Sequence, residues 1–350
     1  MSPQVDESPV LAGALADVLR AEGVPAPDLV PAAEPLVTAR STLYRLTDRS
    51  TGSTYVVKRA VVADGWVDTE AALPTEAQYE ALERAYRWQA EEDRHAVVRP
   101  VGLFPEHDAF AMTWAPGRTL KEVLRRAVVD PSAARTAVAA AGDFLRRFHA
   151  HGRSADVELD LGASVQDVLD FAAGPLREAG LRLPDRVVAT LEQSRGRSVV
   201  APHALLHGDY VPSNLLLQES GEVVMLDPLL ARVGPTVDDL ARFLTVMSSE
   251  TVFLPGEVLP PVRRIRRQLE ATFLSAYGIS GGGALLELRL LKQHLLRWLA
   301  RREHSEVRGV PLLFLVRRVI NDVHMRTLLR ESAARLARAT SDGPVLPDGP

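Results

Sequence analysis

The chain has 350 residues, 46% of them hydrophobic, which is enough for one large or two modest domains. It contains no cysteine, so disulfides and thiolate metal sites are excluded. The first residues are acidic and lack a basic region ahead of the apolar ones, and no uncharged apolar run reaches about 18 residues. These features predict a soluble, cytoplasmic protein with neither a signal peptide nor a membrane span.

The charge of the chain is unevenly distributed. The formal net charge is −4, but the segment from Thr251 to Pro350 contains 16 Lys and Arg against 9 Asp and Glu, a balance of +7. The first 250 residues carry a balance of −11. Such asymmetry between the two parts bears on what each part binds.

The first part of the chain mixes strand and helix patterns. Short apolar runs of strand composition are joined by polar turns, and strong helix formers fill the segment between them. The predicted elements are a helix over Pro9–Glu22, strands over Leu43–Thr47 and Thr54–Ala60, a helix over Thr75–Arg87, and strands over His95–Leu103 and Ala109–Trp114. Pro116-Gly117 then marks the boundary between a small β-rich lobe, residues 1–115, and a larger helical lobe, residues 116–340.

The larger lobe is predicted to be mainly helical because its apolar residues recur at helical spacing. The predicted helices are Leu120–Val129, Pro131–His149, Ser164–Gly180, Pro184–Ser194, Val262–Tyr277, Ala284–Glu303 and Leu312–Ala339. The closing residues 341–350 are expected to form a disordered tail. The fold class that follows is α+β with two lobes.

The segment HGDYVPSNLLLQESGEVVMLD, from His207 to Asp227, carries the residues that point to a chemistry. Two runs of strand composition in it are separated by a turn signal, which predicts a hairpin. With Ser220-Gly221 as a two-residue loop, Asn214 lies opposite Asp227, and opposed residues of an antiparallel pair have Cα atoms about 4.5–5.5 Å apart.

A carboxamide beside a carboxylate provides the oxygen ligands that Mg²⁺ takes when it also holds substrate phosphates. Asp209 lies five residues before Asn214, on the loop that leads into the hairpin. Its carboxylate can face the same cavity as a base for an incoming hydroxyl.

This order of Asp, Asn and Asp resembles the catalytic loop and metal site of the protein-kinase-like fold. The HGD opening is similar to that of the aminoglycoside phosphotransferase and choline kinase-like family, a branch that also includes macrolide, homoserine and fructosamine kinases. The resemblance covers roughly Ala39 to Leu244. It implies Asp209 as the catalytic residue, with Asn214 and Asp227 as the metal ligands.

The resemblance also implies a set of nucleotide contacts in the smaller lobe. Lys58, near the end of a strand, would contact the α- and β-phosphates, and a helix glutamate would hold its ammonium. Glu76 is favoured for that role, and Glu80, which shares its helix face, is the alternative.

The loop over the phosphates would be Ala39–Tyr44, which lacks a GxGxxG pattern. Ser41 and Thr42 there would offer hydroxyls and backbone N–H groups. Thr113, Trp114 and Ala115 resemble the hinge that presents backbone groups to an adenine, although Trp114 fits a plain core role equally well.

Other residues match supporting positions of the family. His207 would pack under the loop that carries Asp209, and Asp239, in GPTVDDLARFL, would hydrogen-bond that loop. His149, in LRRFHAHG, is expected to be structural and not a metal ligand.

The implied reaction is a Mg²⁺-dependent transfer of the γ-phosphoryl group of ATP or GTP to a hydroxyl of a small molecule, such as an antibiotic, a sugar or another metabolite. Only eleven residues separate Asp227 from Asp239, which leaves no room for an activation segment that binds a protein substrate. The positive balance of the C-terminal helices weakly favours a neutral or anionic acceptor, although a solvated arginine face gives the same composition.

Three alternatives stay open at this point. The chain would be a catalytically weak kinase-like nucleotide-binding module, a protein kinase, or a protein that uses its arginine-rich helices on nucleic acid or a membrane surface. No nucleic-acid partner is expected for the favoured function.

Overall fold

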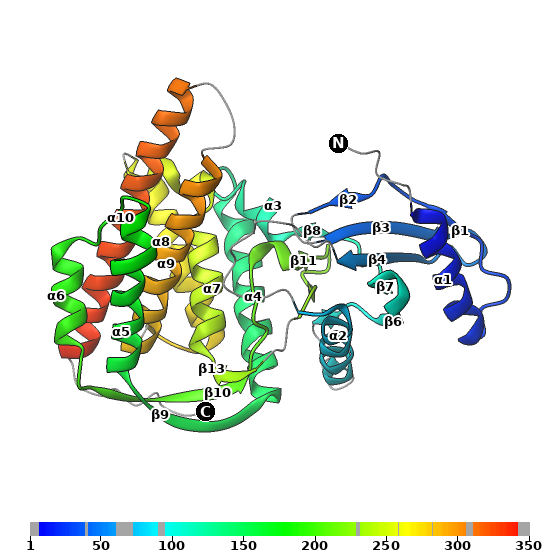
Figure 1. Ribbon diagram of the computed structural model, residues 1–350, viewed down its shortest axis with the longest axis horizontal. Helices are drawn as coiled ribbons and strands as arrows, with labels where there is room; N and C mark the ends of the chain where they lie inside the picture. The colour runs from blue at the N-terminus through cyan, green and yellow to red at the C-terminus, as the bar shows by residue number, and fades with distance from the viewer. Residues whose placement is uncertain are drawn as a thin grey trace. The chain divides into compact units, whose positions relative to one another are not determined.

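The structure, a computed structural model, describes residues 7–38, 41–60, 73–89, 95–228, 232–257, 259–281, 283–305 and 311–341. Most of the predicted tail and part of the predicted phosphate loop, Ala39 and Arg40, lie outside these ranges. The chain divides into two compact units (Figure 1). The first comprises Met1–Gly117 and Val224–Leu229, and the second comprises Arg118–Val223 and Leu230–Pro350.

The first unit is built on an antiparallel sheet of six strands in the order β1-β3-β4-β7-β6, with β2 paired to β3. The strands are β1 (Leu29–Pro31), β2 (Leu36–Val37), β3 (Ser41–Asp48), β4 (Thr54–Ala60), β6 (Pro100–Phe104) and β7 (Ala109–Thr113). The helices of this unit are α1 (Ser8–Ala21) and α2 (Thr75–Gln89). The two predicted helices and the strands predicted over Leu43–Thr47, Thr54–Ala60 and Ala109–Trp114 are therefore confirmed to within a few residues. The single strand predicted over His95–Leu103 is instead two strands, Ala96–Val97 and Pro100–Phe104, which belong to different sheets.

Alternation along the strands gives the sheet two different faces. One face buries Tyr44, Val57 and Ala111 against Leu11 and Leu15 of α1, and these residues belong to one hydrophobic cluster. The other face carries the side chains that alternate with them, and α2 packs there through Tyr79, whose ring meets Phe110 edge-on at 6.0 Å. Residues adjacent in sequence on β3, β4 or β7 thus point to opposite faces.

The first unit also contains a short parallel pair. β5 (Ala96–Val97) pairs with β12 (Val223–Met225), with Val224 opposite Ala96 and Met225 opposite Val97. This pairing incorporates the segment that ends in Asp227 into the first unit, although more than a hundred residues separate it from β5.

The second unit is mainly helical, as predicted. Its longer helices pack around a cluster that includes the fully buried Trp298, whose indole N–H donates to Asp322 Oδ1 at 2.6 Å. The helices are α3 (Leu120–Leu124), α4 (Pro131–His151), α5 (Leu161–Phe171), α6 (Asp185–Gln193), α7 (Val237–Ser248), α8 (Pro260–Tyr277), α9 (Ala284–Ser305) and α10 (Pro311–Ser341). Within the described ranges, none of the helices combines the length and the apolarity that a membrane span requires.

Shorter helical segments complete both units. They are η1 (Pro105–His107) in the first unit, and η2 (Ala172–Leu176), η3 (Pro212–Asn214) and η4 (Thr251–Glu257) in the second.

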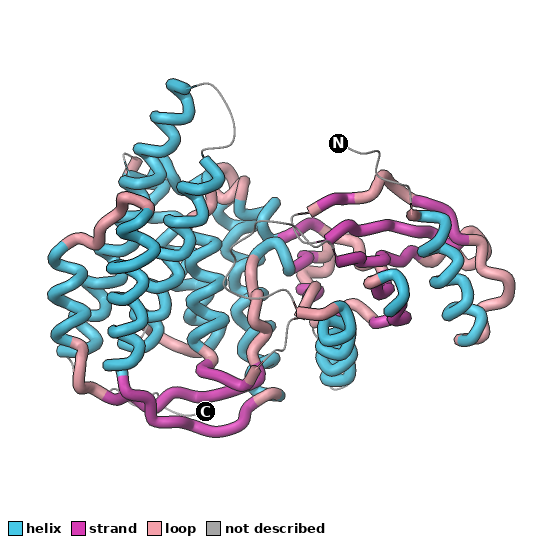
Figure 2. The backbone as a smooth tube through the Cα atoms, in the orientation of Figure 1, coloured by secondary structure: helices cyan, strands magenta, loops and turns pink. Residues whose placement is uncertain are grey.

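A three-stranded sheet interrupts the helices, and no strand was predicted at the positions of its three strands. β9 (Arg153–Asp160) and β10 (Ser198–Leu205) run antiparallel, and β13 (Val233–Pro235) pairs with the other edge of β10 (Figure 2). Most β9 side chains are exposed, so the strand shows no apolar alternation. Its backbone pairing, made with a segment nearly forty residues away, left no local signal.

A layer of buried charges lies among α8, α9 and α10. Arg266, which is 2% exposed, donates to Glu270 Oε1 at 2.5 Å and to Glu331 Oε2 at 2.6 Å. Glu287 accepts from Arg335 Nε at 2.7 Å, while its other oxygen lacks a hydrogen-bond partner among the described residues. Burial, opposed by Arg335, raises the pKa of the Glu287 carboxyl from 4.5 to about 7.

Glu287 therefore makes the stability of the chain depend on pH. Because its pKa is higher in the folded than in the unfolded state, the folded chain binds more protons between pH 4.5 and about 7, and stability falls as the pH rises through that window. The loss is about 3 kcal/mol when complete. Urea unfolding of Glu287→Gln between pH 4.5 and 8 should show a shallower fall than the parent chain. The exposed Glu178→Gln should keep the parent slope, and an equal slope in all three proteins would contradict the account.

Candidate active site

The turn after β11 (Leu215–Leu217) differs from the predicted one. Gly221 N–H donates to Gln218 O at 3.0 Å, and Gln218 N–H donates to Glu222 O at 2.9 Å. Gly221 has a φ of 84°, a left-handed conformation that glycine adopts without steric cost. The loop thus has three residues between its paired ends instead of two, as in hairpins that close with a glycine bulge.

The extra loop residue shifts the register by one. The arithmetic that set Asn214 directly opposite Asp227 is therefore wrong. Asn214 ends the η3 turn before β11 begins, and Asp227 lies two residues after the end of β12. The two residues belong to different units of the chain.

The Asp209 carboxylate, on the loop that precedes β11 in the second unit, is held by two side chains. Its Oδ1 accepts from Arg242 Nε at 3.1 Å and from Arg242 Nη2 at 3.0 Å. Its Oδ2 accepts from Asn214 Nδ2 at 3.1 Å, and the same amide nitrogen donates to the Asp209 carbonyl at 3.0 Å. The Asp209 side chain is 22% exposed, so the carboxylate is held in one orientation but still reaches solvent.

The backbone beneath Asp209 is fixed by a buried carboxylate on α7. Asp239 Oδ2 accepts from His207 N–H at 2.7 Å, and its Oδ1 accepts from Gly208 N–H at 2.9 Å. His149 Nε2 lies 3.1 Å from the same Oδ2, and its Nδ1 lies 2.8 Å from Tyr277 Oη. Because a carboxylate only accepts, His149 donates through Nε2.

The backbone conformation at position 208 explains why a glycine stands there. Its φ is 83°, which costs a residue with a Cβ about 1–2 kcal/mol. This conformation turns two successive N–H groups, those of His207 and Gly208, toward the Asp239 carboxylate. The loop geometry at HGD thus depends on glycine for its shape and on Asp239 for its anchor.

Burial alone would raise the pKa of Asp239, but the hydrogen bond and charge of His149, the charge of His207 and the His207 N–H outweigh burial and hold it below 3.8. Its stabilising effect is present above pH 3.8 and is lost as the pH falls below that value. Asp239→Asn should destabilise the chain by about 2–4 kcal/mol, because an amide N–H would face backbone donors in a buried site. Thermal melts at neutral pH check this, with Asp156→Asn on the exposed strand β9 as control. A melting temperature equal to that of the control would contradict it.

Lys58 and Asp227 come together in the first unit. Lys58 Nζ donates to Asp227 Oδ1 at 2.5 Å, and the lysine side chain is 11% exposed against 34% for the aspartate. Lys58 lies opposite Phe110 on β7, with its ammonium 5.8 Å from the ring centroid. A buried ammonium needs a counter-charge, and Asp227 supplies it here.

Asp227 has an unusual backbone. Its φ of 53° is left-handed, which is uncommon for a residue other than glycine and costs about 1–2 kcal/mol. Such strained positions cluster at functional sites, where the surroundings hold a side chain in a required direction.

The structure does not bring Lys58 together with either predicted glutamate. Glu76 is exposed in the first turn of α2, and Glu80 pairs with Arg84 one turn later at 3.7 Å. Both glutamates are exposed, and Asp227 is the carboxylate that pairs with the buried ammonium. The predicted pairing of Glu76 with Lys58 is corrected accordingly.

Ser41 and Thr42 lie at the start of β3, so the described part of the expected phosphate loop is strand. Alternation puts Ser41 on the sheet face of Lys58 and Thr42 on the face of α1. The Ser41 hydroxyl lies 3.0 Å from Thr38 Oγ1. Because the two side chains point in opposite directions, they cannot both offer hydroxyls to one ligand.

The predicted hinge residues follow β7. Thr113 N–H donates to Arg99 O and Trp114 N–H to Thr54 O, each at 2.9 Å, whereas Ala115 N–H has no acceptor among the described residues. Trp114 is 42% exposed, and the Arg45 guanidinium lies 5.0 Å from its ring centroid. Its indole is therefore not core, and Ala115 is the one of the three predicted hinge residues whose backbone N–H has no acceptor in the described part of the chain.

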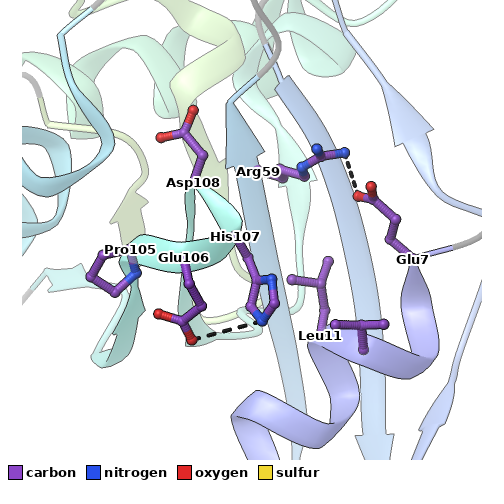
Figure 3. Close-up of a pocket in the computed structure, with 8 residues that line it drawn as sticks. Glu7, Leu11, Arg59, Pro105, Glu106, His107 and Asp108 are labelled. Atoms are coloured by element: carbon purple, nitrogen blue, oxygen red, sulfur yellow. Dashed lines mark ion pairs between the residues drawn. The ribbon is translucent and has the colours of Figure 1, made fainter.

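A pocket of about 340 Å³ in the first unit lies away from these residues. It is lined by Glu7 and Leu11 near α1, by the η1 turn and by Arg59, which forms an ion pair with Glu7 (Figure 3). Arg59 follows Lys58 on β4 and points to the opposite face of the sheet. This pocket therefore lies on the other face of the sheet from Lys58.

Arg242 is the residue that the sequence analysis missed. It lies three residues after Asp239 on α7, and residues at this spacing share a helix face. Asp239 was expected to hydrogen-bond the loop that carries Asp209. The signal for Arg242 was therefore its position on the same helix face as Asp239. Asn214 from the loop and Arg242 from α7 thus hold the Asp209 carboxylate in one orientation, on a loop anchored by Asp239.

The arrangement of helices and antiparallel sheets is that of a kinase-like α+β fold, and solved structures support this. An aminoglycoside phosphotransferase from Alicyclobacillus acidocaldarius is 16% identical, with 89% of this chain and 94% of that chain covered and a TM-score of 0.50. The choline kinase LicA from Streptococcus pneumoniae is 12% identical, with 91% and 98% covered and a TM-score of 0.50. At these identities the likeness shows the fold alone. No curated protein sequence matches the chain.

The fold is therefore kinase-like. Residues 32–291 match the phosphotransferase enzyme family, and the chain belongs to that family. It is therefore a phosphotransferase enzyme.

Proposed function

We propose that the chain transfers the γ-phosphoryl group of ATP or GTP to a hydroxyl of an antibiotic, a sugar or a comparable metabolite. The observation that carries this proposal is the fixed Asp209 carboxylate, with Asn214 and Arg242 on its two oxygens and its loop anchored to Asp239. A carboxylate held in this way accepts a hydroxyl proton in a defined direction.

In the proposed reaction the acceptor oxygen forms a bond to the γ-phosphorus. The bond from that phosphorus to the β,γ-bridging oxygen breaks, the nucleoside diphosphate leaves, and the hydroxyl proton passes to Asp209. Catalysis consists mainly of positioning and charge stabilisation, so no covalent intermediate on the enzyme is required.

Lys58 is proposed to neutralise the α- and β-phosphates from its place on β4. Ser41, on the same face of the sheet, and the backbone of Thr113, Trp114 and Ala115 are proposed as further nucleotide contacts. Ala115 N–H, which has no acceptor in the described ranges, is the strongest candidate of these for a bond to the base.

Asn214 and Asp227 are proposed as ligands of Mg²⁺, and their donor atoms fit that ion. The Asn214 amide nitrogen is used by Asp209, which leaves its oxygen to bind a cation. Asp227 uses Oδ1 for Lys58 and retains Oδ2. Mg²⁺ prefers oxygen ligands of this kind together with substrate phosphates, and it would stabilise the charge on the transferring group.

The acceptor is proposed to be neutral or anionic, in keeping with the positive balance of the last hundred residues. Incubation of the chain with Mg²⁺ and ATP or GTP against a panel of antibiotics, sugars and amino alcohols tests the function. Mass spectrometry should find one acceptor class that gains a single phosphoryl group. Mg²⁺-dependent nucleotide binding without transfer to any member of a broad panel would favour a catalytically weak binding module instead.

A further inference from the structure

Two opposite charges of the first unit compensate one another. Lys58 Nζ donates to Asp227 Oδ1 at 2.5 Å, and no other carboxylate pairs with this lysine in the described part of the chain. Glu76 and Glu80, the two glutamates predicted for that role, are exposed. The lysine side chain is largely buried, with its ammonium 5.8 Å from the Phe110 ring centroid, so it depends on Asp227 for its counter-charge.

Strand pairing fixes the backbone at both ends of this ion pair. Lys58 lies on β4 between two neighbouring strands, opposite Leu43 of β3 on one side and Phe110 of β7 on the other. Asp227 lies two residues after β12, which pairs with β5, and its φ of 53° sets the direction in which its carboxylate leaves the chain. The ion pair thus joins two fixed stretches of backbone within one unit.

The same two side chains are proposed above as a phosphate contact and a metal ligand. Asp227 Oδ1 accepts from the ammonium, which leaves Oδ2 for a cation. A divalent cation on Oδ2 would share one carboxylate with Lys58. The two positive charges would then lie well within the distance of about 8–10 Å over which salt screens exposed charges. Lys58 therefore opposes the binding of a cation that arrives without an anion.

A nucleotide that arrives without a cation meets the opposite obstacle. Its phosphates would compete with Asp227 for Lys58 and would lie beside a carboxylate that has lost its counter-charge. When both ligands are present, the phosphates compensate Lys58 and the cation compensates Asp227. Each ligand then removes the charge that opposes the other, which couples the two binding equilibria positively.

We propose that the ion pair of Lys58 and Asp227 makes the binding of a divalent cation and the binding of a nucleoside triphosphate depend on one another. This inference rests on the proposed function and adds to it a control over which ligands enter the site. Lys58 has two opposite effects on the cation. It weakens the binding of the cation alone, and it supports the binding of the cation together with the nucleotide.

Binding of Mn²⁺ without nucleotide tests the ion pair directly. The electron paramagnetic resonance signal of unbound Mn²⁺ gives the Kd at low ionic strength. Lys58→Met should bind Mn²⁺ at least about 10-fold more tightly than the parent chain, which is the effect of removing a single charge about 6 Å from a divalent one even in bulk water. The double variant Lys58→Met, Asp227→Asn should lose this gain. Equal or weaker Mn²⁺ binding by Lys58→Met, or a gain that the double variant keeps, would overturn the proposal.

Two further variants separate the ion pair from the overall charge of the chain. Lys58→Arg keeps a positive charge beside Asp227 and should bind Mn²⁺ as weakly as the parent. Arg59→Met removes a charge from the next position of β4, which points to the other face of the sheet and pairs with Glu7, so it should leave the Mn²⁺ affinity nearly unchanged. A gain in Arg59→Met as large as that in Lys58→Met would show that overall charge sets the affinity, and the proposal would fail.

The converse measurement uses ATP with a chelator and does not require Lys58→Met to fold. Asp227→Asn releases Lys58 and removes the carboxylate that repels the phosphates. By calorimetry it should bind metal-free ATP about 10-fold more tightly than the parent, and with Mg²⁺ the order of the two proteins should reverse. Binding of metal-free ATP no tighter than the parent's would contradict the inference. Absence of nucleotide binding by the parent under both conditions would instead contradict the proposed function, and the Mn²⁺ comparison would still decide the inference.

Discussion

Asp209→Asn should lower kcat by about 10³-fold, because the amide keeps the shape of the side chain but cannot take the hydroxyl proton. The Arg242 guanidinium and the Asn214 amide donate to the two carboxylate oxygens, so the substitution also removes one acceptor from this arrangement. Nucleotide binding should be nearly unchanged, since Asp209 is assigned to the acceptor.

The measurement for Asp209→Asn is a pair of assays on one preparation. Steady-state transfer gives kcat, and a titration of Mg²⁺-nucleotide gives the Kd. Asp156→Asn, a neutralised carboxylate on the exposed strand β9, serves as control and should match the parent in both assays. Full activity in Asp209→Asn would remove the role of base from this residue, and an equal loss of nucleotide affinity would assign it to nucleotide binding.

Lys58→Met is expected to lower kcat/KM for the nucleotide by about 10²- to 10³-fold. The lysine supplies a buried positive charge, and charge in a site shielded from water stabilises developing negative charge far more than it would in solution. The substitution leaves Asp227 without its cation, so some loss of stability should accompany the loss of rate.

Arg59→Met is the matched control for Lys58→Met. It removes a positive charge from the next position of the same strand, but that charge points to the other face of the sheet and pairs with Glu7. Kinetics of the two variants, measured at one nucleotide concentration series, should separate by at least about 10²-fold. Similar kinetics in the two variants would show that Lys58 does not act on the nucleotide.

Local patterns predicted the framework well where an element carries its own signal. The helix formers of Thr75–Gln89 and the apolar spacing of Pro131–His151 sufficed to locate α2 and α4. β9 was missed because most of its side chains are exposed, and it exists through pairing with β10. Exposed strands leave neither an apolar run nor an alternation in the sequence.

The candidate site was predictable to the extent that its residues lie close together in sequence. Asp209 and Asn214 share one loop, and their spacing predicted that both face one cavity. The hydrogen bond between their side chains was not predicted. Long-range packing determines two contacts, the hydrogen bond of Lys58 to Asp227 and that of Arg242 to Asp209. The predicted pairing of Lys58 with a glutamate was wrong for the same reason. A helix face shows which residues lie together, but it does not show which charge compensates a lysine on another element.

The hairpin shows how a small error in a turn propagates. The predicted loop had two residues, whereas the observed loop has three. Gly221, with its positive φ, is the last residue of the three-residue loop. In a strand pair, a shift of one residue changes which side chains are opposed and which face they occupy. The apolar runs on either side tolerate both registers, so composition alone did not distinguish them.

Asn214 and Asp227 are proposed to bind one divalent cation together with the nucleotide. Mn²⁺ replaces Mg²⁺ in the most direct measurement, and its electron paramagnetic resonance signal is followed in the presence of a non-hydrolysable nucleotide. We predict a ternary signal for the parent chain and for Asp209→Asn, and a loss of affinity of about 10- to 100-fold in Asn214→Ala and in Asp227→Ala. Unchanged Mn²⁺ affinity in those two variants would contradict the claim.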